Sequence, residues 1–198
     1  LAILGDPGSG KTTHMKRVLL QITRQGSPSL GLPPDAVPIL VSLRDLEDGD
    51  ADLASFIDRS LTLPPLSRKK EVGKKILKRG NVLLLIDGLD EVRSGKRREE
   101  VARWIQDALV TRADWRFLVT SRYAGYTNDV RFDAHFLEMH LRPLDKAQAE
   151  DFVRRWYGIV ETAIPGNDRE QRRECGDTRH HHAVAEKPVR AFGARRVG

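Results

Sequence analysis

Short apolar runs alternate along this chain with longer stretches in which apolar residues recur every three or four positions. The five runs are Leu1–Leu4, Val37–Leu43, Val82–Asp87, Arg116–Ser121 and Phe136–Leu141. Runs of this length are typical of buried strands, and the spacing between them is typical of amphipathic helices. The alternation therefore predicts an α/β fold, with a five-stranded parallel sheet and helices on both faces.

Helical spacing is clearest in four stretches, whose apolar positions span Met15–Ile22, Leu53–Leu61, Val101–Leu109 and Ala149–Trp156. We expect the last of these helices to begin at Asp145. Its carboxylate can accept from the unpaired N–H groups of the first turn, while Gln148 reaches back to the backbone of the cap. The apolar residues of this helix are expected to form a buried face, and they are Ala149, Phe152, Val153 and Trp156.

A glycine-rich motif, Gly-Asp-Pro-Gly-Ser-Gly-Lys-Thr, follows the first predicted strand and opens the first helix. Glycines let a backbone approach phosphate closely, and converging N–H groups at a helix N-terminus attract the anion. Lys11 is then placed for the β- and γ-phosphates and the Thr12 hydroxyl for Mg²⁺. A glycine-rich turn with an incidental lysine would not explain the flanking strand and helix. The residues predicted to bind the nucleotide are Gly5, Asp6, Pro7, Gly8, Ser9, Gly10, Lys11, Thr12 and Thr13.

Three acids follow the third predicted strand, in the order Asp87-Gly88-Leu89-Asp90-Glu91. Ligands of such sheets bind at the carboxyl ends of the strands, so Asp87 is expected near the Mg²⁺, through water. Asp90 and Glu91 are candidate catalytic residues that orient or deprotonate an attacking water. The alternative is that Asp90 caps the next helix.

The fourth predicted strand ends in Thr120-Ser121-Arg122. An arginine at this edge can contact the γ-phosphate, which makes Arg122 a third catalytic candidate. The alternative is a surface arginine paired with a local acid, and the sequence leaves both open.

Taken in order, these three motifs resemble those of NACHT domains, the nucleotide switches of signal-transduction ATPases that include the NOD-like receptors. The resemblance covers residues 1 to about 157. It implies a three-layer P-loop NTPase sandwich with strand order 5-1-4-3-2, ATP or ADP with Mg²⁺ as ligands, slow hydrolysis, and self-association of the full-length protein. The family continues into a helical lid and a winged helix, and residues 166–198 resemble neither, so hydrolysis by this chain is expected to be slow or impaired.

The composition changes after Pro165, since residues 166–198 contain no Leu, Ile or Met. Such a segment buries too little apolar surface to offset its ordering entropy. We therefore expect a nucleotide-binding domain over residues 1–160 and a poorly ordered tail over 161–198. Cys175 and the consecutive His180, His181 and His182 do not match the ligand spacing of tetrahedral zinc. Because the chain begins with Leu at the phosphate strand, we expect it to be a fragment of a larger protein.

The chain has a net charge of +6, and its one dense basic cluster lies between residues 68 and 79. The apolar positions Val72, Ile76 and Leu77 within it predict a surface helix. Its charged face is either solvated or in contact with nucleic acid, and the lack of interleaved aromatic residues favours the solvated face.

The sequence favours an ATP-binding, slowly hydrolysing switch of NACHT type, acting in signalling or defence. Two alternatives remain: a P-loop kinase or nucleic-acid-stimulated ATPase, and a truncated remnant that serves only as an interaction module. The longest apolar run, Val82–Ile86, is far too short to span a membrane. A single cysteine fits a reducing compartment, so a cytoplasmic location is expected.

Overall fold

The computed structural model describes residues 1–47, 49–61 and 72–163. The chain forms two compact units, Leu1–Pro143 and Leu144–Gly198. The described part of the second unit is one helix, α5 (Lys146–Ala163). The expectations for residues 166–198 lie outside the described residues, and the domain boundary at residue 160 stays a prediction.

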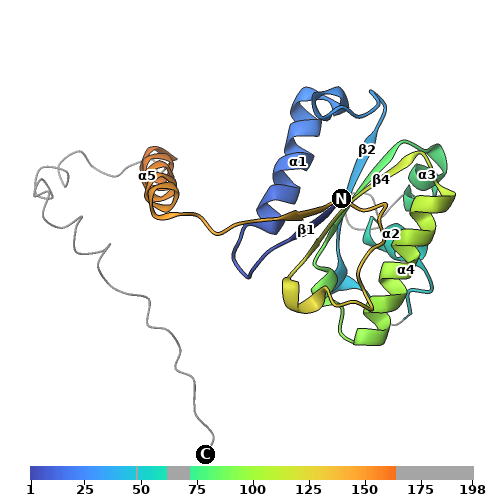
Figure 1. Ribbon diagram of the computed structural model, residues 1–198. Helices are drawn as coiled ribbons and strands as arrows, with labels where there is room; N and C mark the ends of the chain where they lie inside the picture. Colours follow the sequence, from blue (N-terminus) through green and yellow to red (C-terminus); the bar gives the residue numbers. More distant parts are fainter. Residues whose placement is uncertain (48, 62–71, 164–198) are drawn as a thin grey trace, which may run out of the picture. The chain divides into compact units, whose positions relative to one another are not determined.

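A five-stranded sheet forms the centre of the first unit (Figure 1). Neighbouring strands are parallel and follow the order β2-β3-β4-β1-β5. This confirms the predicted parallel sheet and its order, in which β1 lies between β4 and β5. The strands are β1 (Ala2–Leu4), β2 (Val37–Ser42), β3 (Val82–Asp87), β4 (Trp115–Ser121) and β5 (Glu138–His140).

Helices cover both faces of this sheet, as Figure 1 shows. On one face lies α1 (Lys11–Gln25), whose buried residues Met15 and Ile22 pack with Ile3, Leu85 and Leu118 of the strands. The other face is covered by α2 (Leu53–Ser60), α3 (Val72–Arg79) and α4 (Gly95–Thr111). Strands that are covered on both faces must be apolar on both sides, which explains the unbroken run Val82–Ile86 in β3.

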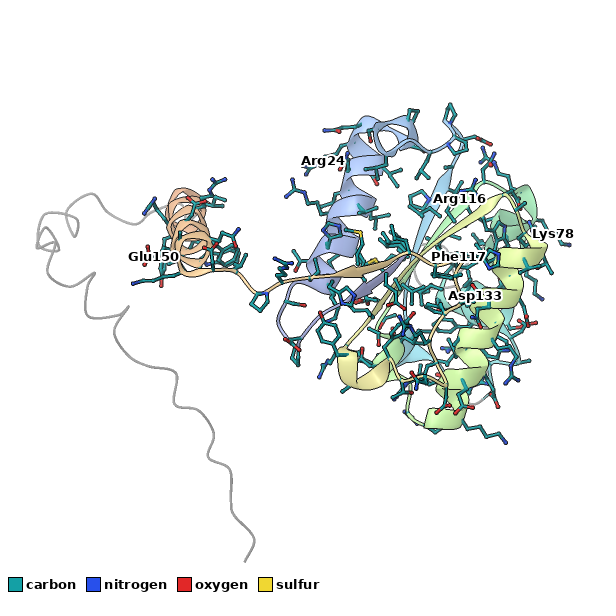
Figure 2. The ribbon with its side chains drawn as sticks, viewed as in Figure 1. Arg24, Lys78, Arg116, Phe117, Asp133 and Glu150 are labelled. Atoms are coloured by element: carbon teal, nitrogen blue, oxygen red, sulfur yellow. The ribbon has the colours of Figure 1, made fainter. Side chains whose placement is uncertain are left out.

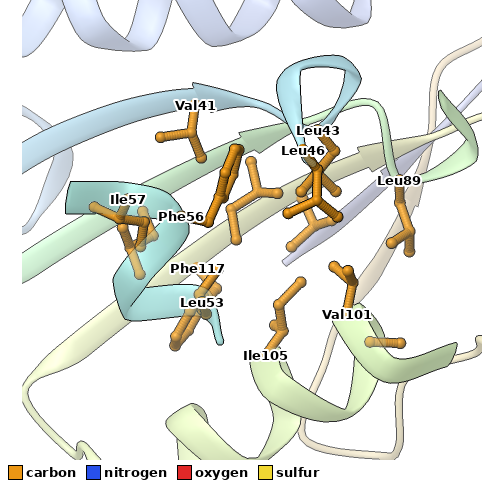
Figure 3. Close-up of a cluster of buried hydrophobic side chains, with 14 of the residues drawn as sticks. Val41, Leu43, Leu46, Leu53, Phe56, Ile57, Leu89, Val101, Ile105 and Phe117 are labelled. Carbon is orange, nitrogen blue, oxygen red and sulfur yellow. The ribbon is translucent and has the colours of Figure 1, made fainter. Parts of the chain in front are cut away.

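The larger core lies between the sheet and helices α2 to α4 (Figure 3). Phe56 and Ile57 of α2, Ile105 of α4 and Leu84 of β3 are all fully buried. Such packing fixes the strand positions tightly, because a close-packed core leaves few voids into which an element can shift. The core therefore determines which polar residues meet where the strands end.

Two expectations differ from the structure. The fifth strand is shorter than predicted because Phe136 turns into the core, where its ring stacks on Phe132 at a centroid distance of 4.2 Å.

In α5, the predicted cap is present: Gln148 N donates to Asp145 Oδ1 at 2.9 Å, and Asp145 N donates to Gln148 Oε1 at 3.1 Å. The face expected to be buried is exposed, since Trp156 is 58% exposed and the described part of its unit contains no other element to cover it.

Across the described residues, every helix is too short or too polar to cross a lipid bilayer.

Candidate functional site

The loop from Gly5 to Gly10 joins β1 to α1 at the carboxyl edge of the sheet. Gly8 and Gly10 have φ angles of 79° and 91°, a left-handed conformation that glycine adopts without strain. This backbone turns sharply and begins the helix directly, with His14 N donating to Gly10 O at 2.8 Å. The loop thus brings its backbone to the N-terminus of a 15-residue helix, where the helix dipole is positive.

Lys11, the first residue of α1, folds back over this loop. Its Nζ donates to the carbonyl oxygens of Gly5 at 2.7 Å and Asp6 at 2.9 Å, and lies 3.4 Å from the Ser9 hydroxyl. The ammonium group is therefore held over the loop itself. Asp6, Pro7 and Thr13, the other polar or flanking positions of the motif, are exposed.

The carboxylate of Asp87, at the end of β3, connects the loop helix to the sheet. Its Oδ2 accepts from Thr12 Oγ1 at 2.7 Å, and its Oδ1 accepts from Thr120 Oγ1 at 2.5 Å. The Thr120 hydroxyl in turn accepts from Gly88 N at 2.9 Å. Three elements that are distant in the sequence, α1, β3 and β4, therefore meet at one carboxylate.

Asp90 lies in the turn η4 (Leu89–Glu91) and is paired with Arg122, the residue after β4. Asp90 Oδ1 accepts from the backbone N–H of Arg122 at 2.9 Å, and Oδ2 lies 3.1 Å from Arg122 Nε. The structure thus has the arginine in the second of the two predicted arrangements, paired with a local acid. The cap alternative for Asp90 is wrong, because Ser94 caps α4 by accepting from Arg97 N at 3.1 Å.

Glu91 is paired with Arg44, which follows β2 in the turn η2 (Leu43–Asp45). Arg44 donates from Nε and Nη2 to the two carboxylate oxygens at 3.0 and 2.9 Å, a bidentate contact that fixes the orientation of both planar groups. The hydrogen bond to Glu91 raises the pKa of Arg44, with the negative charge of Glu91 as the second cause.

Comparison with known proteins decides the family. A family model described as the NACHT domain matches residues 1–158. The chain belongs to the NACHT domain family. The resemblance inferred from the three motifs is therefore confirmed, and with it the P-loop NTPase class of the fold.

Two solved structures are similar to this NACHT domain. The ORC1 protein of Aeropyrum pernix, in a complex with DNA, matches with a TM-score of 0.48 and 16% identity over 77% of this chain and 42% of that one. Drosophila ORC bound to DNA matches with a TM-score of 0.51 and 18% identity over 77% of this chain and 38% of that one. This chain thus spans about two fifths of either neighbour, and the likeness to Drosophila ORC concerns the fold alone. A search of curated proteins found no match.

The NACHT domain offers oxygen ligands for a hard cation beside its phosphate loop. The Thr12 hydroxyl and the Asp87 carboxylate are in direct contact beside the phosphate loop, and Mg²⁺ prefers such oxygen donors together with phosphate and water. Among the described residues, no cluster of three or more His, Cys, Asp or Glu side chains forms a separate metal site.

Sequence reasoning missed Thr120 and Arg44. Thr120 is the last residue but one of the buried strand β4, and its position beside Asp87 follows only from the register that pairs Ile86 with Val119. Arg44 likewise reaches Glu91 because Ser42 of β2 pairs with Asp87 of β3. The available signal was a polar residue at or just past the end of a strand, but this signal becomes specific only when the neighbouring strand is known.

Thr120→Val is expected to destabilise the NACHT domain by about 1–3 kcal/mol, because the shape is kept while the buried N–H of Gly88 and the Asp87 carboxylate each lose a hydrogen bond. Urea unfolding measures the change. Thr111→Val is the control, since the Thr111 hydroxyl is exposed and bonds only the carbonyl of Asp107 one turn earlier. Equal stability of the two variants would contradict a supporting role for Thr120.

Proposed function

We propose that this NACHT domain binds ATP with Mg²⁺, hydrolyses it slowly to ADP, and acts as a nucleotide-controlled switch in signalling or defence. In this proposal residues 1–160 form the nucleotide-binding domain of a larger cytoplasmic protein that self-associates. The observation that supports it most is the contact of Thr12 with Asp87 next to the loop over which Lys11 lies. Thr12 and Asp87, the two residues that would bind the cation, are then next to the ammonium group of Lys11, which would bind phosphate.

In the bound state, the backbone N–H groups of the loop and the dipole of α1 bind the phosphates. Lys11 exchanges its contacts with the loop carbonyls for the β- and γ-phosphate oxygens. Thr12 and Asp87 hold the Mg²⁺, which when bound neutralises charge that builds on the phosphates during transfer.

For hydrolysis, Asp90 and Glu91 orient a water and accept its proton while its oxygen attacks the γ-phosphorus and the bond to the β–γ bridging oxygen breaks. The Arg44 contact keeps the Glu91 carboxylate in a fixed orientation. Arg122, whose side chain is 47% exposed, can exchange Asp90 for the γ-phosphate. Such an exchange gives ATP and ADP states different contacts, and a ligand shifts a conformational equilibrium only through such a difference.

The proposal is tested by binding of Mg²⁺-ATP and Mg²⁺-GTP to the full chain, measured by calorimetry with and without EDTA. We expect ATP to bind more tightly than GTP, and the affinity to fall when Mg²⁺ is removed. Tight binding of GTP without binding of ATP would contradict the base assignment, and absence of binding by either nucleotide would contradict the proposal as a whole.

A further inference from the structure

The positive charge of this chain is concentrated in one segment outside the nucleotide site. Residues 68–79 contain seven Lys or Arg side chains and one Glu, a net charge of +6 that equals the net charge of the whole chain. The described part of this segment is α3, which carries four cations and no acid. These cations are Lys74, Lys75, Lys78 and Arg79, and all four are exposed.

Helix α4, on the same face of the sheet, carries charges of both signs, and Arg97 pairs with Glu100 at 2.7 Å. The cations of α3 instead stand one helical turn apart, Lys74 above Lys78 and Lys75 above Arg79, where like charges repel each other. A solvated face alone gives no reason for this pattern. The charged residues of α4 are Lys96, Arg97, Arg98, Glu99, Glu100, Arg103 and Asp107.

The packing of α3 holds these cations on a rigid support. Gly73 lies so close to α2 that a Cβ there would be 2.5 Å from the Asp58 Cα. Leu77 is 4% exposed in the core, and its carbonyl accepts from Arg112 Nη2 at 2.7 Å at the end of the helix. The helix is therefore fixed at its start, its middle and its end, so binding would cost little ordering of its backbone.

Two acids pack close to the ends of α3. Asp58 accepts from the backbone N–H of Lys74 at 3.1 Å at the start of the helix, and Asp114, beyond its end, is paired with Arg112 at 3.4 Å. Within the ranges that the structure describes, no ion pair joins Lys75, Lys78 or Arg79 to an acid. Figure 2 shows Lys78 at the periphery of the molecule, directed away from the sheet. The charges of Lys75, Lys78 and Arg79 are therefore available to an external anion.

We propose that α3 binds the sugar–phosphate backbone of a double-stranded nucleic acid, independently of its sequence. Cations one turn apart on the helix are about 6 Å apart along its axis, and a duplex offers one negative charge per about 1.7 Å. Single strands fit less well, because α3 has no aromatic side chain on which bases could stack. A lipid surface also fits less well, because an interfacial helix inserts an apolar face, and the apolar face of α3 is used in the core.

The test uses the full chain and 24-base-pair DNA and RNA duplexes, with fluorescence anisotropy measured over a range of salt concentrations. The variant Lys75→Gln, Lys78→Gln, Arg79→Gln is expected to bind on the order of tenfold more weakly at low salt. The slope of log K against log salt should fall in magnitude by about 2 to 3, close to one per cation removed. The matched control is Lys16→Gln, Arg17→Gln, Arg24→Gln, which removes the same charge from exposed positions of α1 on the other face of the sheet.

Three results would overturn the proposal: no binding of either duplex, an equal loss in both triple variants, or tighter binding of single strands. Binding to phosphatidylserine vesicles that is lost in the α3 variant, without duplex binding, would assign α3 to a membrane surface instead. Nucleotide binding serves as an independent readout, because the α3 variant is expected to retain it. The proposal of nucleotide binding and the proposal of duplex binding by α3 can therefore fail separately.

Discussion

Lys11→Ala is expected to weaken binding of Mg²⁺-ATP by about ten- to a hundredfold. A charge-assisted hydrogen bond contributes about 1.5–3 kcal/mol, and tenfold in affinity is about 1.4 kcal/mol. Lys11 lies over the phosphate loop, with its ammonium group 2.7 Å from the Gly5 carbonyl oxygen. Loss of this charge leaves the loop with backbone donors alone. Isothermal titration calorimetry measures the difference.

The matched control for this prediction is Lys16→Ala, which removes an exposed lysine from the same helix. It is expected to leave the affinity within about twofold, because a solvated charge outside the loop is largely screened. Thermal unfolding of both variants separates loss of binding from loss of fold. If Lys11→Ala retained the affinity of the unchanged protein while remaining folded, the phosphate-loop assignment would be wrong.

Replacing both Asp90 and Glu91 by Ala is expected to lower ATP turnover by about a hundredfold or more, since general-base catalysis contributes about 10²–10⁴. The affinity for ATP is expected to change little, because neither carboxylate contacts Lys11, Thr12 or Asp87 in the structure. Phosphate release under single-turnover conditions measures the first quantity and calorimetry measures the second.

Single variants divide this effect between the two acids. Glu91→Gln keeps the size of the side chain and removes the base, whereas Asp90→Asn weakens the contact with Arg122. Arg44→Met is the companion variant, since it leaves Glu91 present but without its bidentate partner. An unchanged hydrolysis rate in the double variant would rule out the catalytic role of both acids.

The contacts between Asp90 and Arg122 determine how such a switch would respond to nucleotide. Asp90 binds both the backbone and the side chain of Arg122, and Gly125 is packed so closely on Asp90 that a Cβ there would lie 2.2 Å from the Asp90 Cβ. A shift of Arg122 toward the γ-phosphate would therefore break the ion pair while the turn around Asp90 stays packed. The guanidinium, rather than the turn, is the part free to change partners.

Much of the fold and the centre of the site could be predicted from local signals. The glycines of the phosphate loop, the aspartate that ends β3 and the Asp145–Gln148 cap each act over a few residues, so their physical effect is present in the sequence itself. The alternation of apolar runs and helical spacing likewise sufficed for the parallel sheet, because burial on both faces requires strands that are apolar throughout.

The partners of the polar residues at the sheet edge were decided only by the tertiary structure. Thr120 lies 33 residues from Asp87, and Arg44 lies 47 residues from Glu91. They meet because packing of the core places β4 and β2 on either side of β3, in registers that no local pattern encodes. The pairing of Arg122 with Asp90 was likewise decided by the tertiary structure, because the two residues are far apart in the sequence. The sequence by itself determined which groups stand at the strand ends, and the packing of the sheet determined which of them touch.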